Sequence, residues 1–155
     1  MRRLLLLCLL LTATAGCDRV TKHLALTTLA GHPEQSFLGD TIRFEYHENP
    51  GAFLSFGATW RPETQRVVFQ LANAVFLAGI AVVALRSWSR LAACGLMLIF
   101  AGGVSNLIDR VTVGRVIDFL NVGIGPLRTG IFNVADVAIM AGIALLVFEL
   151  HTRRA

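Results

Sequence analysis

Charged residues are scarce in this chain. Asp, Glu, Lys and Arg together make up only 15% of its 155 residues, whereas hydrophobic residues make up 55%. The mean hydropathy is +0.65. A balance this apolar excludes an ordinary soluble protein and indicates a membrane protein. The length suits a single unit, so we expect residues 1–155 to form one integral membrane domain.

Cysteine clusters and basic stripes are also missing. Cys8, Cys17 and Cys94 lie in or beside apolar runs, show no Cys-x-x-Cys spacing and are not accompanied by a cluster of histidines. The pattern predicts neither a disulfide framework nor a zinc site. The formal net charge of +4 does not indicate nucleic acid, because the arginines are scattered at segment ends without interleaved aromatic residues. We therefore expect no metal, no cofactor and no nucleic-acid partner.

Long apolar runs are abundant, and four of them approach the roughly 20 residues that a bilayer-spanning helix needs. They predict an all-α membrane protein with spans at residues 4–26, 67–85, 91–108 and 133–150. The third span carries Ala101 and Ser105 in the small-xxx-small spacing that lets helices approach closely. Four spans place both termini on the same side as the connection between the second and third spans. By the positive-inside rule this side is cytoplasmic, because it holds Arg2, Arg3, Arg86, Arg90, Arg153 and Arg154.

The first apolar run allows two interpretations. Residues 4–16 follow Met1-Arg-Arg and resemble the apolar region of a signal peptide, and Thr14-Ala-Gly-Cys17 resembles a lipoprotein cleavage box. The helical pattern nevertheless continues through Val20 to Leu26. We therefore favour an uncleaved first span. A lipoprotein anchored through Cys17 stays open as an alternative, although further spans would make a lipid anchor redundant.

Residues 27–63 differ from the spans in being mostly polar and rich in turn residues. Ile42-Arg-Phe44-Glu-Tyr46 alternates, and Asn49-Pro-Gly51 then indicates a turn. We expect a small strand-containing region outside the membrane that caps one end of the bundle. It would rest on the bilayer through Phe37, Phe53, Phe56 and Trp60. Turn chemistry alone is an alternative explanation of Asn49-Pro-Gly51.

Two aspartates, Asp118 and Asp136, stand beside apolar segments. An ionised side chain at the bilayer centre costs about 2.5 to 3.5 kcal/mol, so such residues usually mark function. The interval between them contains Gly123, Gly125, Pro126 and Gly130 and cannot be one continuous helix. The two carboxylates therefore come from separate elements that can fold back to form a dyad. Asp136 also fits the third position of a helix capped by Asn133, and this capping box is compatible with the dyad.

The predicted topology gathers polar residues from distant segments at the outer ends of the spans. A transport path would more often place them near the midplane, so the pattern indicates a site open to the outer leaflet. The simpler interpretations are an exposed i, i+4 pair for Asp18 and Lys22, and an ion pair with Arg110, or a snorkelling arginine, for Asp109. The residues gathered there are Asp18, Lys22, Asn49, Asn106, Asp109, Arg110, Asp118, Asn133 and Asp136.

Five short motifs, spread over nearly the whole chain, closely resemble those of the bacterial lipoprotein signal peptidases, signal peptidase II. They follow the family order on a four-span pattern. One position departs from the family, because Ser105 stands where glycine usually precedes the asparagine of the third-span motif. The motifs are Asp18-Arg-Val-Thr-Lys22, Asn49-Pro-Gly-Ala-Phe53, Gly102-Gly-Val-Ser-Asn106-Leu-Ile-Asp109-Arg110, Val116-Ile-Asp118-Phe and Phe132-Asn-Val-Ala-Asp136.

The resemblance implies a membrane aspartic endopeptidase of the bacterial inner membrane, with Asp118 and Asp136 as its dyad and Asp109 outside it. It implies that the substrate is a diacylglyceryl-modified prolipoprotein, cut just before the lipidated cysteine without a metal or covalent intermediate. We expect Asn49 and Arg110 to hold substrate backbone, membrane lipid to surround the chain, and the enzyme to be monomeric. The family positions that shape or support the site correspond to Asp18, Lys22, Asn49, Gly51, Asn106, Arg110, Asn133 and Ala135.

A small four-span transporter or a membrane scaffold subunit is the remaining alternative. Either would explain four spans and polar residues at membrane depth. Neither gives a reason for two aspartates on either side of a broken connection, next to an asparagine-rich outer site.

Overall fold

The computed structural model of the chain describes residues 2–50, 61–87 and 89–153. Its four long helices are α1 (Arg2–Thr28), α2 (Pro62–Arg86), α3 (Arg90–Thr112) and α4 (Val134–Thr152). The segments Leu4–Thr28, Arg66–Arg86, Arg90–Thr112 and Val134–Thr152 are each long and apolar enough to cross a membrane. The predicted four-span fold is thereby confirmed. The third helix runs a full turn beyond its predicted end at residue 108, so its polar residues are all helical.

A four-stranded antiparallel sheet accompanies the helices, with strand order β1-β2-β3-β4. Strands β1 (Gln35–Phe37) and β2 (Ile42–Asn49) confirm the predicted strand-containing region. Strands β3 (Val116–Ile124) and β4 (Leu127–Arg128) come from the connection between α3 and α4. The sequence pattern of residues 116–128 indicated only a broken connection, so these two strands were not predicted. The sheet therefore joins the two extramembrane connections through the pairing of β2 with β3.

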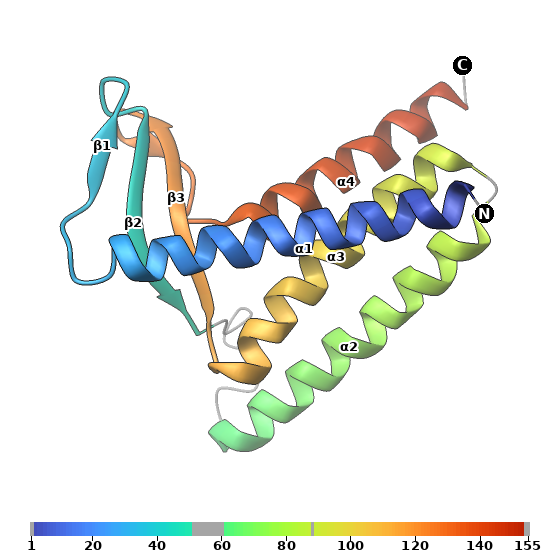
Figure 1. Cartoon of the computed structure of the whole chain (residues 1–155), viewed down its shortest axis with the longest axis horizontal. Helices are drawn as coiled ribbons and strands as arrows, with labels where there is room; N and C mark the ends of the chain where they lie inside the picture. Colours follow the sequence, from blue (N-terminus) through green and yellow to red (C-terminus); the bar gives the residue numbers. More distant parts are fainter. Residues whose placement is uncertain (1, 51–60, 88, 154–155) are drawn as a thin grey trace.

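The sheet lies across one end of the helix bundle (Figure 1). The beginning of α1, the end of α4 and the connection between α2 and α3 all lie at the opposite end (Figure 1). Successive helices therefore alternate in direction. This arrangement brings the end of α3 and the beginning of α4 to the sheet.

Two kinds of packing fix the sheet end relative to the helices. Ala25, near the end of α1, and Leu29, just after it, form a buried apolar cluster with Phe119 of β3. Helices α3 and α4 approach closely through small residues, since a Cβ atom added to Gly102 would overlap the carbonyl oxygen of Ala135. The predicted close packing of the third span therefore involves a glycine next to Ala101, at the level where α4 begins.

Part of the predicted membrane contact of the sheet region lies outside the described residues, namely Phe53, Phe56 and Trp60. Gly51 and Arg154 lie outside them too. Phe37, at the end of β1, is 48% exposed.

Candidate active site

The two aspartates of the predicted dyad are brought together at the junction of the sheet with α4. Asp118 lies in β3 with its side chain buried, and Asp136 lies in the first turn of α4. The β2–β3 register places His47 opposite Asp118 and Asn49 opposite Val116. The side chain of Asn49 donates to Oδ2 of Asp118 at 3.0 Å. Asn49 thus contacts a residue of the predicted dyad and does more than form a turn.

Asn133 contacts both aspartates. Its Nδ2 donates to Oδ1 of Asp118 at 2.6 Å, and its backbone N–H donates to Oδ2 of Asp136 at 3.1 Å. Its Oδ1 accepts from the backbone N–H of Asp136 at 3.0 Å, which completes the capping box at the start of α4. The predicted capping box is confirmed. A single buried residue therefore caps the helix and links the two carboxylates.

Asn106, from α3, supplies the remaining donor to Asp136. Its Nδ2 donates to Oδ1 of Asp136 at 2.9 Å, while its Oδ1 accepts from Nζ of Lys22 at 2.8 Å. Oδ1 also accepts from Nδ2 of Asn133 at 3.3 Å. Because the N–H groups of Lys22 and Asn133 both point at the amide oxygen of Asn106, its amide nitrogen must be the atom that faces Asp136. Each oxygen of Asp118 and Asp136 thereby receives one N–H group, and α1, α3, α4 and the sheet all contribute to holding the pair.

Lys22 belongs to a cluster of charged side chains, which we call the buried charge cluster: Asp18, Lys22 and Asp109 are buried, and Arg19, 40% exposed, pairs with Asp109 at its edge. Nζ of Lys22 lies 2.7 Å from Oδ2 of Asp18 and 2.7 Å from Oδ2 of Asp109, and all three side chains are at least 97% buried. The interpretation of Asp18 and Lys22 as an exposed helix pair is therefore wrong. Charges removed from water in this way need partners, and here each has at least one.

Asp18 ties α1 to the start of α4. Its Oδ1 accepts from the backbone N–H of Ala135 at 2.8 Å, and its Oδ2 accepts from Oγ of Ser105 at 2.6 Å. The N–H of Ala135 lies in the first helical turn and has no acceptor within α4 itself. Ser105 is completely buried. The hydroxyl at the position where glycine is usual is thus a hydrogen-bond donor to a buried carboxylate.

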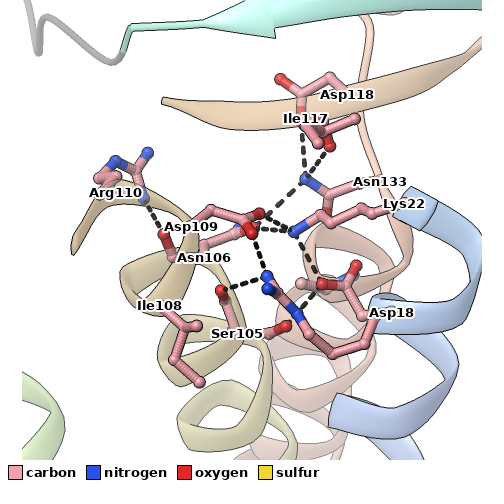
Figure 2. A network of polar contacts seen from close by, with 12 residues as sticks. Asp18, Lys22, Ser105, Asn106, Ile108, Asp109, Arg110, Ile117, Asp118 and Asn133 are labelled. Atoms are coloured by element: carbon pink, nitrogen blue, oxygen red, sulfur yellow. Dashed lines mark hydrogen bonds and ion pairs between the residues drawn. The ribbon is translucent and has the colours of Figure 1, made fainter. Parts of the chain in front are cut away.

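Asp109 does not pair with its neighbour Arg110. It pairs with Lys22 and with Arg19, whose guanidinium also donates to the backbone carbonyl of Ser105 at 3.2 Å. Figure 2 shows Arg110 pointing away from the cluster, with its guanidinium donating to the carbonyl of Asn106 at 3.3 Å. The alternative interpretation of Asp109 as an ion-pair partner of Arg110 is therefore wrong. Successive residues of a helix point about 100° apart, so Asp109 and Arg110 face different neighbours.

The electrostatics of Asp118 suit a carboxyl that holds a proton. Burial raises the pKa of Asp118, and the negative charge of Asp136 acts in the same direction. The amide donors from Asn49 and Asn133 and the charge of Lys22 act in the opposite direction but do not cancel the increase. A carboxyl whose pKa is raised in this way keeps its proton to a higher pH than an ordinary aspartate does.

Most of the predicted site residues therefore form one connected network, part of which is drawn in Figure 2. Gly51 lies outside the described residues. Arg110 lies at the edge, facing away. Sequence reasoning missed Arg19, although it stands inside the first motif, because nothing in the sequence indicates that it reaches Asp109. The network residues are Asp18, Lys22, Asn49, Asn106, Asp118, Asn133, Ala135 and Asp136.

No group of three or more metal-ligating side chains lies together in the described part of the chain. The expectation of a reaction without metal stays a prediction. The site contains two carboxyl groups, each of which accepts hydrogen bonds from amide N–H groups. Asp118 is buried, whereas Asp136 is half-buried at the surface of the site. Such a pair can activate a water molecule and protonate a carbonyl oxygen.

Comparisons with known proteins agree on one family. The family model of signal peptidase (SPase) II matches residues 10–152. A lipoprotein signal peptidase of Desulforapulum autotrophicum is 34% identical over 96% of this chain and 93% of its own length. A lipoprotein signal peptidase of Geobacter metallireducens is 40% identical over 86% of this chain and 82% of its own length.

A solved structure of a bacterial membrane enzyme has the same fold. It superimposes with a TM-score of 0.80 at 23% sequence identity, and the match covers 96% of this chain and 89% of the other.

Proposed function

Because this chain belongs to the signal peptidase II family, we propose that Asp118 and Asp136 are its catalytic aspartates. The chain is a multi-pass membrane aspartic peptidase that cleaves the signal peptides of prolipoproteins. The observation that carries the assignment of the dyad is the bridge through Asn133, which donates to both carboxylates. Residues 1–155 would act as one peptidase domain.

In the proposed reaction Asp118 holds the shared proton and Asp136 is ionised. Asp136 removes a proton from a water molecule, whose oxygen attacks the scissile carbonyl carbon. Asp118 donates its proton to the carbonyl oxygen, which gives a tetrahedral diol. The C–N bond then breaks as Asp136 gives the proton that it took from water to the leaving amine nitrogen, while Asp118 takes a proton from one hydroxyl of the diol. The carboxylic acid product forms, and the dyad is again protonated at Asp118 and ionised at Asp136. Neither a metal nor a covalent enzyme intermediate takes part in this scheme.

Two features support this division of roles. Burial raises the pKa of Asp118 and favours its protonated form. Asp136 sits at the positive end of α4 and accepts from the N–H of Asn133 and from Nδ2 of Asn106, and both contacts favour a carboxylate. Asn106, Asn133, Lys22, Asp18 and Ala135 are positioning residues in this scheme.

The substrate proposed for this site is a diacylglyceryl-modified prolipoprotein, cut just before its lipidated cysteine. The signal helix would lie among the spans, and residues 27–63 would cover it from the outer side. Asn49 is close enough to Asp118 to contact backbone next to the scissile bond. Arg110 faces away from Asp118, so we place it at the edge of the site and not at that bond.

The orientation of the chain also remains a proposal. We propose that the end opposite the sheet is cytoplasmic in the bacterial inner membrane, because the connection between α2 and α3 and the end of α4 carry Arg86, Arg90 and Arg153 there. The site would then face the outer leaflet. We also propose that the enzyme works as a monomer, because α1, α3, α4 and the sheet of one chain supply every contact described above.

The family match and the continuity of α1 argue against the transporter, the scaffold subunit and the lipid-anchored protein. The family match runs through residues 10–152, which leaves no reason to prefer a transporter or a scaffold subunit. Anchoring through Cys17 would require cleavage within the continuous helix α1. It would remove Leu7, which packs in a buried cluster with Ala84, Ala93 and Met97.

The test is cleavage of a purified diacylglyceryl-modified prolipoprotein by the detergent-solubilised enzyme in the presence of chelator. We expect Asp118→Asn and Asp136→Asn each to lower the rate by at least about 100-fold, the usual scale for loss of a general acid or base. Asp40→Asn is the matched control, because Asp40 is a half-exposed carboxylate that pairs with Arg43 at the far turn of the sheet. Parental activity in either dyad variant, or loss of activity with chelator, would refute the assignment.

A further inference from the structure

A second polar site lies beside the catalytic network, where α2 begins and α3 ends. It is a cleft of about 460 Å³ between the first turns of α2, the last turn of α3 and the start of β3. Three arginines line it, namely Arg66, Arg110 and Arg115, together with Gln70 and Gly114. We call it the arginine cleft. Neither Asp118 nor Asp136 lines it, and Figure 2 shows Arg110 directed away from the buried charge cluster.

Two of these arginines have no acidic partner among the described residues. Most other basic side chains at the sheet end lie within 4 Å of a carboxylate: Arg19, Lys22, Arg43, Arg115 and Arg128. No such pair forms at Arg66 or Arg110 within residues 2–50, 61–87 and 89–153. The positive charges of Arg66 and Arg110 are therefore not neutralised by the described part of the chain, which favours an anion as the ligand of the cleft.

The donors of Arg110 are also incompletely used. A guanidinium has five N–H groups, and the carbonyl of Asn106, at 3.3 Å, is the hydrogen-bond acceptor described for it. Gln70 holds the backbone of the same residue by donating to the carbonyl of Arg110 at 2.8 Å. The backbone is thus fixed while most of the charged group remains available. Arg115, at the rim, pairs with Glu48.

The depth of the arginine cleft matches the lipid headgroups. Arg66 is the first residue of the second membrane-crossing segment, and Arg110 lies within the last turn of the third. The surface around them is apolar and exposed. Val111 lines the cleft next to Arg110, and Val67 and Leu71 follow Arg66 along α2 away from the sheet end, with Val67 53%, Leu71 62% and Val111 63% exposed. The phosphate groups of a bilayer lie at the membrane–water boundary, and the acyl chains lie directly beneath them. The arginines and the exposed apolar side chains of α2 follow one another in the same order.

We propose that the arginine cleft binds the phosphate of a phospholipid from the surrounding leaflet. Arg66 and Arg110 donate to the phosphate oxygens, Arg115 lies at the rim, and the acyl chains extend from the cleft along Val67 and Leu71 of α2. Guanidinium groups bind phosphate through paired N–H donors. An anionic headgroup such as phosphatidylglycerol binds more tightly than phosphatidylcholine, because the choline cation is repelled by the same arginines. The proposal stands independently of the dyad assignment.

The test measures binding of phosphatidylglycerol to the delipidated full-length chain in neutral detergent, by native mass spectrometry and by the shift in unfolding temperature. Arg66→Gln removes one guanidinium from the arginine cleft. Arg61→Gln is the matched control, because Arg61 is an exposed arginine just before α2 that does not line the cleft. We expect Arg66→Gln to weaken binding by about tenfold, the effect of losing one charge-assisted contact, and Arg61→Gln to bind as the parent does.

Two further binding measurements distinguish the possible ligands. Inorganic phosphate at the same concentration should not raise the unfolding temperature, since it lacks acyl chains, and phosphatidylcholine should bind more weakly. Equal binding by Arg66→Gln and the parent, or equal losses in Arg66→Gln and Arg61→Gln, would overturn the proposal. So would an Arg66→Gln variant that binds phosphatidylglycerol normally but has a raised KM for prolipoprotein, because the cleft would then hold substrate.

Discussion

Replacing Lys22 by methionine tests whether the buried charge cluster stabilises the fold and orients the dyad. Lys22 places one ammonium between two carboxylates, 2.7 Å from Asp18 and 2.7 Å from Asp109, with all three groups out of water. Methionine has a similar length and fills the same space without the charge. The substitution leaves two buried carboxylates facing each other with less positive charge between them.

The size of the effect follows from burial. Removing one partner of a buried ion pair typically destabilises a protein by about 3 to 5 kcal/mol. Asp109 keeps Arg19, and Asp18 keeps Ser105 and the N–H of Ala135, so we expect the lower end of that range. A loss of about 3 kcal/mol corresponds to roughly 6 to 12 °C in unfolding temperature for a chain of this size. Arg43→Met, which breaks a half-exposed pair with Asp40, should shift it much less.

Lys22→Met should also slow the reaction through Asn106. The ammonium holds the oxygen of the Asn106 amide at 2.8 Å and so keeps its nitrogen on Asp136. Without the ammonium the amide of Asn106 can flip, and its oxygen would then face the carboxylate of Asp136. We expect kcat to fall with little change in KM, because the substituted group lies beneath the site and not at its surface.

Thermal unfolding in detergent, together with steady-state cleavage of a prolipoprotein, checks both effects. The double variant Asp18→Asn with Lys22→Met should be less destabilised than the sum of the two single variants, because it removes the uncompensated carboxylate as well. An unchanged unfolding temperature in Lys22→Met would refute the reasoning about the cluster. An unchanged kcat in a variant that is destabilised would refute the role of Lys22 in orienting Asn106.

Three further predictions concern single contacts. Gly102→Ala should destabilise the chain and lower activity, because the added Cβ would overlap the carbonyl of Ala135. Gly79→Ala is its control, since nothing lies within 4 Å of the added atom, and it should behave as the parent in the same unfolding and cleavage assays. Ser105→Ala should lower stability by about 1.5 to 3 kcal/mol, the range for a hydrogen bond to a charged group, and an unfolding temperature equal to the parent's would contradict the bond to Asp18. Asn49→Ala removes a donor that favours the ionised form of Asp118, so the loss of activity at high pH should move to higher pH, and a move to lower pH would contradict that contact.

Much of the helical part of the fold could be predicted because each span is a long apolar run with its own boundary signals. Asn133 followed three residues later by Asp136 gave both the start of α4 and its capping box, which depend only on local sequence. The sheet was harder. The run Val116–Ile124 contains Gly123 and is followed by Gly125 and Pro126, so it signals a broken connection, but its pairing with β2 depends on a segment more than sixty residues away in the sequence.

The contacts between residues of the site could not be predicted from local sequence either. Asp109 stands next to Arg110 in sequence, yet it pairs with Arg19 and Lys22, because contacts between α1 and α3 decide which face of α3 meets which charge. Ser105 was predicted only as a small residue for close helix packing. Its role as a hydrogen-bond donor could not be predicted, because its acceptor, Asp18, comes from another helix. Motif positions identified the residues of the site, and only the packing of the helices showed which of them touch.

The pH dependence of kcat/KM for prolipoprotein cleavage, measured with chelator present, tests the central proposal of a proton-sharing dyad most directly. We expect a bell-shaped profile. Activity should rise as the pair loses its first proton, and it should fall as Asp118 loses the second, at a pH above the usual range for aspartate because the pKa of Asp118 is raised. A profile without the falling limb would contradict a protonated carboxyl as the acid, and activity that is highest with both carboxyls ionised would contradict the dyad itself.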